Sequence, residues 1–172
     1  IFKVGTAPEA AGQYYCFAKD SGAPGAWLPG TPGINGRNTD GTTVADRGCI
    51  SAGTPISGIN YIRDIVTTAS QAGTFILADV LWVNTGLVVT TTTAQAITQP
   101  TLPLRDNLGT SNGFGVGAGI LVTTATTNAA AIATITLSYT NSEGVAGKTA
   151  TISSYPATAV IGTFVPFQLA QG

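Results

Sequence analysis

A strictly alternating stretch in the C-terminal half constrains the fold of this chain more than any other feature. From residue 134 to residue 140, isoleucine, leucine and tyrosine alternate with threonine and serine. Successive side chains of a β-strand point to opposite faces, so this period of two predicts a strand with one buried face. The chain turns at Asn141-Ser142-Glu143-Gly144 and returns through residues 148–152. The two segments predict a β-hairpin.

Other segments also favour an all-β chain. Within residues 69–93, two apolar β-branched runs flank the turn Asn84-Thr85-Gly86, and we expect this meander near the centre of the fold. Further strands are expected at residues 1–4, 13–18, 74–83, 113–123 and 160–167. Many short strands without a convincing helix predict an antiparallel β-sandwich or a jelly-roll-like fold.

Residues 57–68 allow two interpretations. Isoleucines at positions 56, 59, 62 and 65 repeat every three residues, which suits one face of a helix. Gly58, Asn60 and the tail Val66-Thr67-Thr68 favour an extended segment instead. We expect a strand here, forming a hairpin with residues 74–83, followed by a long loop over residues 101–113.

Between residues 22 and 48 the composition changes to Gly/Pro-rich turn chemistry, which predicts a long arm or loop. We therefore divide the single domain into residues 1–55, with N-terminal strands and the arm, and a β-sandwich body at residues 56–172. Apolar side chains in the arm have no local core, so they must pack on the body, a neighbouring subunit or a ligand. The candidate partner contacts are Trp27, Leu28, Ile34 and Arg37. For Trp27 the alternative is a plug at one end of its own sandwich.

The low charge of the chain bears on its partners. Charged residues make up 9% of the sequence, against roughly 25% in ordinary soluble domains. With a net charge of −1, such a surface favours a protein that is part of an assembly over a free monomer. Seven basic residues scattered among eight acidic ones argue against binding to nucleic acid or to an anionic membrane. No apolar run is long enough for a transmembrane helix.

Two cysteines, Cys16 and Cys49, flank the arm. A disulfide that closes this loop and a pair of free, buried thiols both explain them, and the two interpretations stay open. Because the chain has no histidine, two cysteines alone predict no metal site, and no cofactor is expected. The chain begins at Ile1 rather than at methionine, so we expect a processed product or a fragment.

Catalysis has little support in the sequence. The eight acidic residues are spread singly and no histidine accompanies them, so no acid and base pair stands out. Asp64 beside Arg63 and Asp106 beside Arg105 predict structural ion pairs. We therefore expect a protein that is not an enzyme.

Glycine occupies every second position from residue 113 to residue 119, which leaves one face of the expected strand without side chains. Something flat or bulky must lie against such a face. The alternatives are Trp82 or a phenylalanine from within the fold, or the backbone of a neighbouring subunit. Internal packing is favoured, with Trp82 as the expected residue.

A series of segments carries a resemblance to a known class of protein. In order, they are Gly73 to Gly86 (GTFILADVLWVNTG), residues 88–95 (VVTTTTAQ), residues 102–106 (LPLRD), Asn112-Gly113, residues 123–128 (TTATTN), residues 137–142 (LSYTNS) and Ala146-Gly147. Over residues 59–169, this pattern of strands and turns resembles virion structural proteins of tailed bacteriophages. The arm at residues 22–48 is not part of the resemblance.

The resemblance implies a role without catalytic or cofactor-binding residues. Proteins of this kind are similar to capsid decoration or cement proteins and related head or tail components, often β-sandwiches that assemble as trimers. The expectation is therefore a homo-oligomer, with a trimer favoured, that bridges neighbouring capsid subunits. Its partners would be the major capsid protein or other virion proteins, and its place the capsid surface rather than the tail. The alternative is a tail-fibre or receptor-binding module that recognises cell-surface glycans through Trp27 or a tyrosine platform.

Overall fold

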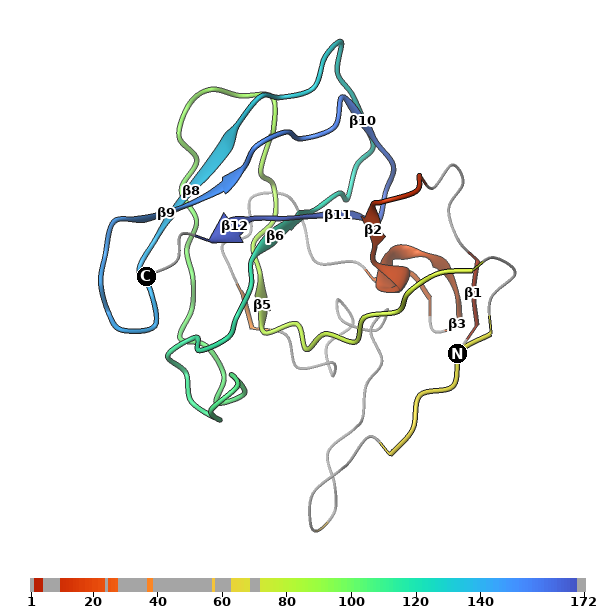
Figure 1. The fold of residues 1–172 in the computed structure, drawn as a ribbon, viewed down its shortest axis with the longest axis horizontal. Coiled ribbons are helices and arrows are strands. Elements are labelled where there is room, and N and C mark those ends of the chain that lie inside the picture. Colours follow the sequence, from red (N-terminus) through yellow and green to blue (C-terminus); the bar gives the residue numbers. More distant parts are fainter. Residues whose placement is uncertain are drawn as a thin grey trace.

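The computed structural model describes residues 2–4, 10–23, 25–27, 37–38, 57, 63–68 and 72–169, to which the statements below refer. Within these residues all strand pairs are antiparallel. The helical element among them is a short 3₁₀ turn, η1 (Phe17–Lys19). The described chain is therefore essentially all-β, as its alternating sequence predicts (Figure 1).

The C-terminal hairpin is present with the expected bounds. Strand β8 (Ile135–Tyr139) pairs with β9 (Lys148–Ile152), and Ile135 lies opposite Ile152. Along β8 half-buried side chains alternate with exposed ones, so the predicted burial pattern is confirmed. The side-chain oxygen of Asn141 accepts backbone N–H groups of Glu143 and Val145 at 3.1 and 2.8 Å, which closes the turn in the way common for asparagine.

Two three-stranded sheets form the described body. In one, β9 lies between β8 and β12 (Gln168–Leu169). In the other, β11 (Thr163–Pro166) lies between β2 (Tyr14–Tyr15) and β6 (Gly119–Leu121). Because β11 is followed by β12 after the single residue Phe167, one extended stretch of chain links the two sheets (Figure 1).

The hydrophobic core draws on both sheets. Its buried cluster consists of Val122, Ile152, Tyr155 and Ala159. Partly buried residues that pack against the cluster include Ile120 and Val165 from the β2-β11-β6 sheet, Ile135 from the β12-β9-β8 sheet, Phe167, Ile132 and Val89. Among the described residues, this buried cluster therefore lies in the C-terminal part of the chain, and the expected central meander at residues 69–93 contributes Val89, packed against the cluster, and Leu81, which is 7% exposed.

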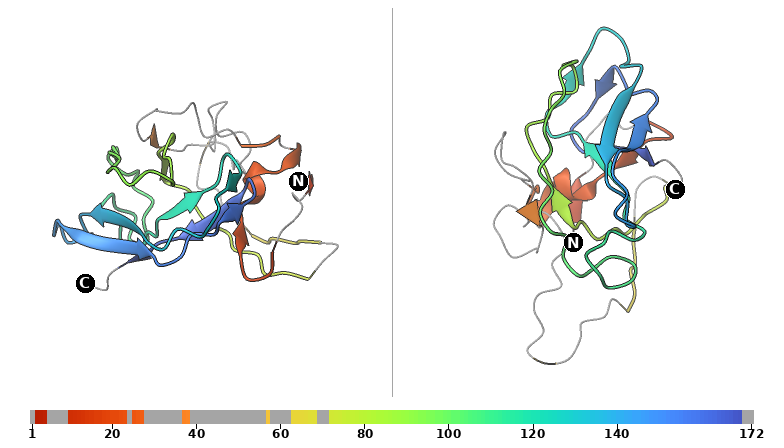
Figure 2. Two further views of the ribbon diagram at one scale, coloured as in Figure 1. Left: turned by 90° about the horizontal axis from the view of Figure 1, so that it is seen from above. Right: turned by 90° about the vertical axis from the view of Figure 1, so that its left-hand side faces the viewer.

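Short strand pairs complete the fold. Strand β1 (Phe2–Val4) pairs with β3 (Ser21–Ala23), and β7 (Thr126–Thr127) pairs with β10 (Thr158–Ala159). Within the arm, β4 (Arg37–Asn38) pairs with β5 (Trp82–Val83). Viewed from above, the β8–β9 hairpin and the N-terminal elements lie at opposite ends of the molecule (Figure 2).

The hairpin expected between residues 57–68 and 74–83 is wrong over the described residues. Residues 63–68 and 72–81 are assigned to no strand, and Trp82–Val83 pairs with β4 instead. Their β-forming composition favours an extended backbone, but composition does not specify a partner strand. The long loop expected at residues 101–113 is confirmed, since no strand occurs there.

The strand expected at residues 113–123 is shorter, because its first half is a turn. Gly113 and Gly115 have φ angles of 86° and 67°, a left-handed region that glycine adopts without steric cost. Hydrogen-bonded strand is confined to Gly119–Leu121. The expected internal packing occurs at Gly119, where the ring of Phe164, rather than Trp82, takes the space of the missing side chain.

Candidate functional site

Large apolar side chains are exposed along one stretch of the chain, which makes it the candidate interaction surface. In segment 72–78, Phe75, Ile76 and Leu77 are 42%, 69% and 57% exposed. Nearby in sequence, Val66 is 89% exposed. Isolated exposed apolar residues are ordinary, whereas a contiguous run of them marks an interaction site in a soluble protein.

The backbone of segment 72–78 also lacks hydrogen-bond partners within the described part of the chain. The segment belongs to no strand, and the structure gives none of its residues a backbone hydrogen bond. Backbone N–H and C=O groups of folded chains normally find partners. Segment 72–78 therefore has the side chains of a strand and lacks the sheet that a strand requires.

Two contacts hold this segment on its own chain. The ring of Phe75 stacks on that of Phe17, with centroids 5.3 Å apart. Beyond the other end, the carboxylate of Asp79 pairs with Arg105 at 3.1 Å. These two contacts hold the segment in place on the chain, and Ile76 and Leu77 between them remain exposed to solvent.

The loop that carries Arg105 is organised by the next residue, Asp106. Its Oδ1 accepts backbone N–H groups of Leu108 and Thr110 at 3.0 and 2.6 Å. Its Oδ2 accepts the Thr110 hydroxyl at 2.6 Å and the N–H groups of Gly113 and Phe114, both at 3.1 Å. Five donors thus converge on one carboxylate.

Asp106 as a residue is only 7% exposed. Burial by itself raises the pKa of this carboxyl, but the hydrogen bonds from Thr110, Leu108 and Phe114 outweigh it and hold the pKa well below its ordinary value. A carboxylate whose lone pairs are occupied in this way is a poor base or metal ligand, and its role is to shape the loop. The expected Arg105–Asp106 ion pair is wrong, because Arg105 pairs with Asp79.

The loop around Asp106 presents two leucines to solvent. Leu104 and Leu108 are 71% and 65% exposed. Sequence analysis identified the loop but missed this arrangement. The sequence does carry a signal for this loop, because Asp106 is followed by the turn segments Asn107-Leu108-Gly109 and Asn112-Gly113. In such a context Asp side chains commonly accept hydrogen bonds from nearby backbone N–H groups.

The arm residues expected to contact a partner have separate outcomes. Trp27 is 2% exposed, so its indole is buried in the structure and is not presented to a partner. Arg37 lies in β4, where it pairs with Val83. Leu28 and Ile34 lie outside the described residues.

Cys16 carries a free, half-buried thiol. Burial raises the pKa of this thiol above its ordinary value, against smaller lowering effects of hydrogen bonds from the Ala18 and Lys19 backbone. The other member of the expected cysteine pair, Cys49, lies outside the described residues.

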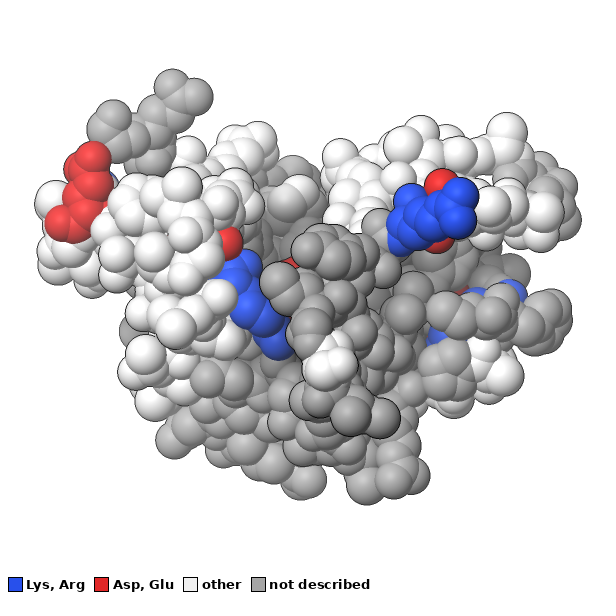
Figure 3. All heavy atoms as spheres, turned by 90° about the horizontal axis from the view of Figure 1, so that it is seen from below, with Lys and Arg blue, Asp and Glu red and all other residues white. Residues whose placement is uncertain are grey.

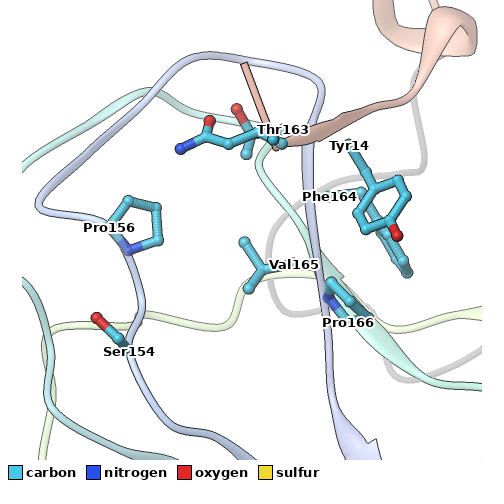
Figure 4. Close-up of a pocket in the computed structure, with 9 residues that line it drawn as sticks. Tyr14, Ser154, Pro156, Thr163, Phe164, Val165 and Pro166 are labelled. Carbon is cyan, nitrogen blue, oxygen red and sulfur yellow. The ribbon is translucent and has the colours of Figure 1, made fainter. Parts of the chain in front are cut away.

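A small surface hollow of about 260 Å³ lies beside β11. Its lining has no charged residue: Gly12, Gln13, Tyr14, Ser154, Pro156, Thr163, Phe164, Val165 and Pro166. The side chains of Thr163 and Val165 lie on the side of β11 that faces Pro156 (Figure 4). Thr163 is 1% exposed, and its hydroxyl has no hydrogen-bond partner.

Charged side chains are sparse on the surface. In the face shown in Figure 3, charged groups occupy few places among uncharged residues, and basic groups lie beside acidic ones. An exposed pair joins Arg63 to Asp64 at 3.3 Å, as the sequence predicts. Among the described residues, no three side chains of His, Cys, Asp or Glu gather where they could hold a metal ion. The described part of the chain also contains no helix of the length and apolarity needed to cross a membrane.

Comparison of the chain with protein-family models, with curated proteins and with solved structures gives no match.

Proposed function

We propose that this chain is a structural protein of a bacteriophage virion, a decoration or cement protein that bridges neighbouring capsid subunits. The order of strand and turn segments from Gly73 to Ala146-Gly147 supports this proposal by its resemblance to such proteins. The structural observation that carries it is segment 72–78, where exposed apolar side chains coincide with an unpaired backbone. Both features favour a protein that completes its packing on a neighbour.

The composition supports the same role. Only 9% of the residues are charged, so the surface resists association less than that of an ordinary soluble domain. The loop shaped by Asp106 adds two exposed leucines, Leu104 and Leu108, held on a well-ordered turn. Preorganised apolar groups bind with a smaller loss of conformational entropy than mobile ones.

We further propose that the β2-β11-β6 and β12-β9-β8 sheets are the two layers of a β-sandwich. Support comes from the core, since Val165 of the first sheet and Ile135 of the second pack against one buried cluster. An experimental structure in which the two sheets lie side by side in one layer would contradict this arrangement.

Capsid binding tests the functional proposal. The purified chain is added to capsids of the phage that encodes it, after removal of the endogenous protein, and binding is measured by co-sedimentation. Ile76→Lys and Leu77→Lys place a charge on the exposed apolar segment and are expected to abolish binding. Val145→Lys, at another exposed apolar residue in the β8–β9 connection, is the matched control and is expected to bind normally. Failure of the unmodified chain to bind, with unchanged capsid stability in its absence, would refute the role.

A glycan-binding module is the second candidate, and the hollow beside β11 is the observation that favours it. Its lining is uncharged and includes Tyr14, which is 53% exposed, and an exposed aromatic side chain with a polar hydroxyl suits contact with a neutral sugar. Tyr14→Ala is expected to remove glycan binding on an array while leaving the fold intact. An array without signal for the unmodified chain would exclude this candidate.

A further inference from the structure

Strand β8 is an edge strand without the usual protection against pairing. It borders the β12-β9-β8 sheet, and residues 135–138 form hydrogen bonds to β9 alone. Natural proteins commonly blunt such an edge with lysine, proline or a bulge. From residue 134 to residue 140 the chain has no charged residue and no proline, and β8 pairs with β9 in continuous register.

Segment 72–78 offers what this edge lacks. It runs as a drawn-out stretch without helix or strand (Figure 1), its backbone groups are unpaired, and three of its apolar side chains are exposed. In an extended chain the backbone N–H and C=O groups point sideways, in the plane between the two side-chain faces. The segment can therefore pair along its edge while Phe75 keeps its stack on Phe17 and Asp79 keeps its ion pair with Arg105.

Within one chain the two elements are too far apart to pair. In Figure 1, β8 lies at the upper left, whereas the yellow-green segment 72–78 lies to the right of centre, beyond β5 and near β1. The anchors at Phe17 and Arg105 hold segment 72–78 there.

We propose that segment 72–78 of one copy adds as an outer strand to β8 of a second copy. Strand addition of this kind obtains affinity from main-chain hydrogen bonds. The contact joins two different surfaces, so it is heterologous, and repeated copies close into a ring or continue as a filament. Neither β8 nor segment 72–78 contains a charged residue, so no like charges oppose the pairing. This self-association does not depend on the virion role.

Point variants test the two surfaces separately. Ile76→Pro removes a donor N–H from the added strand. Proline also favours an extended conformation at the preceding residue, which is the conformation that an added strand requires. Ser138→Lys places a charge on the exposed side of the β8 edge. Each variant is expected to weaken self-association by about tenfold or more in analytical ultracentrifugation.

Matched controls use equivalent positions outside the contact. Val66→Pro inserts proline into another exposed stretch that lies in no strand. Thr149→Lys adds the same charge opposite Ser138, on the central strand β9. Both controls are expected to self-associate normally. Equal loss in the controls and the test variants would overturn the proposal, as would a chain that is monomeric up to its solubility limit.

Mixing the two variants identifies a heterologous contact directly. Ile76→Pro retains an intact β8, and Ser138→Lys retains an intact segment 72–78. At a concentration at which each variant alone is monomeric, their mixture is expected to form a 1:1 dimer that cannot extend further. Absence of the mixed dimer would overturn the proposal. In hydrogen exchange of the unmodified chain, the amides of residues 72–78 and of β8 should gain protection together as concentration rises; protection of one set without the other would also overturn it. Capsids are absent from these measurements, so their failure is distinguishable from failure of the proposed function.

Discussion

The ring of Phe164 lies against Gly119 so closely that a Cβ built on the glycine would overlap three of its ring carbons. Gly119 begins β6, and Phe164 lies in the neighbouring strand β11. The contact lets two strands of one sheet approach with a bulky aromatic ring between their side chains. It gives the glycine of this strand a packing role.

Gly119→Ala is expected to destabilise the protein by about 1–3 kcal/mol, the usual range for overpacking in a well-packed site. The loss is measured by denaturant unfolding. Phe164→Leu in the same chain should recover part of it, because the smaller side chain gives the new methyl group room.

Gly117→Ala is the matched control. No heavy atom beyond its chain neighbours lies within 4 Å of a Cβ built at Gly117, and its φ is not in the left-handed region. Since alanine restricts the unfolded chain, this variant should be neutral or more stable by up to about 1 kcal/mol. Equal destabilisation by the two variants would show that the Phe164 contact is not the cause.

The carboxylate of Asp106 should take up a proton at a lower pH than an ordinary aspartate. Hydrogen bonds to the charged form hold its pKa below the ordinary value of 3.8, so the stability it contributes is fully present above that pH. This contribution is lost only as the pH falls through the lower, folded pKa. In an NMR titration, the carboxyl chemical shift of Asp106 and the amide shift of Thr110 should therefore stay constant as the pH is lowered from neutral to about 4. A midpoint at or above 3.8 would contradict this assignment.

Asp106→Asn should open the loop without unfolding the chain. An amide group has one acceptor oxygen, and its NH₂ group would face backbone N–H donors that now bond to the carboxylate. The amides of Leu108, Thr110 and Phe114 are expected to exchange with solvent faster, while those of the β8–β9 hairpin keep their protection. Unchanged exchange in the loop would show that the carboxylate does not organise it.

The sequence determines the β8–β9 hairpin because its information is local. Period-two alternation and an Asn-Ser-Glu-Gly turn specify both strands and their register. In segment 72–78 the same kind of residues specifies only an extended backbone, since the partner strand is remote or belongs to another molecule. Gly113 and Gly115 are two residues apart, which matches the period of a strand, although both have the left-handed backbone of a turn.

The candidate functional residues also depend on contacts that no local sequence pattern reveals. The role of Asp106 depends on five donors spread over residues 108–114, and no single position signals their convergence. The burial of Trp27 depends on packing that turn composition does not reveal. Tertiary context, rather than local propensity, decides both.

The Asp79–Arg105 ion pair should contribute little to stability. Both side chains are exposed to solvent, at 56% and 40%, so water and salt screen their attraction. A double-mutant cycle with Asp79→Ala and Arg105→Ala is expected to give a coupling free energy of about 0.2–1 kcal/mol that falls as salt is added. A coupling well above this range that persists in high salt would contradict a screened surface pair.

The thiol of Cys16 should react slowly with alkylating reagents in the folded chain. Burial raises its pKa above the ordinary value of a cysteine thiol, so the reactive thiolate is scarcer at neutral pH than for an exposed cysteine. Alkylation by iodoacetamide, followed residue by residue by mass spectrometry, should accelerate when the chain is unfolded and when the pH is raised. Because Cys16 carries a free thiol in the structure, it should also be labelled without reductant once the chain is unfolded, and a block that reductant removes would contradict this. Equal rates in the folded and unfolded chain would contradict the buried environment of Cys16.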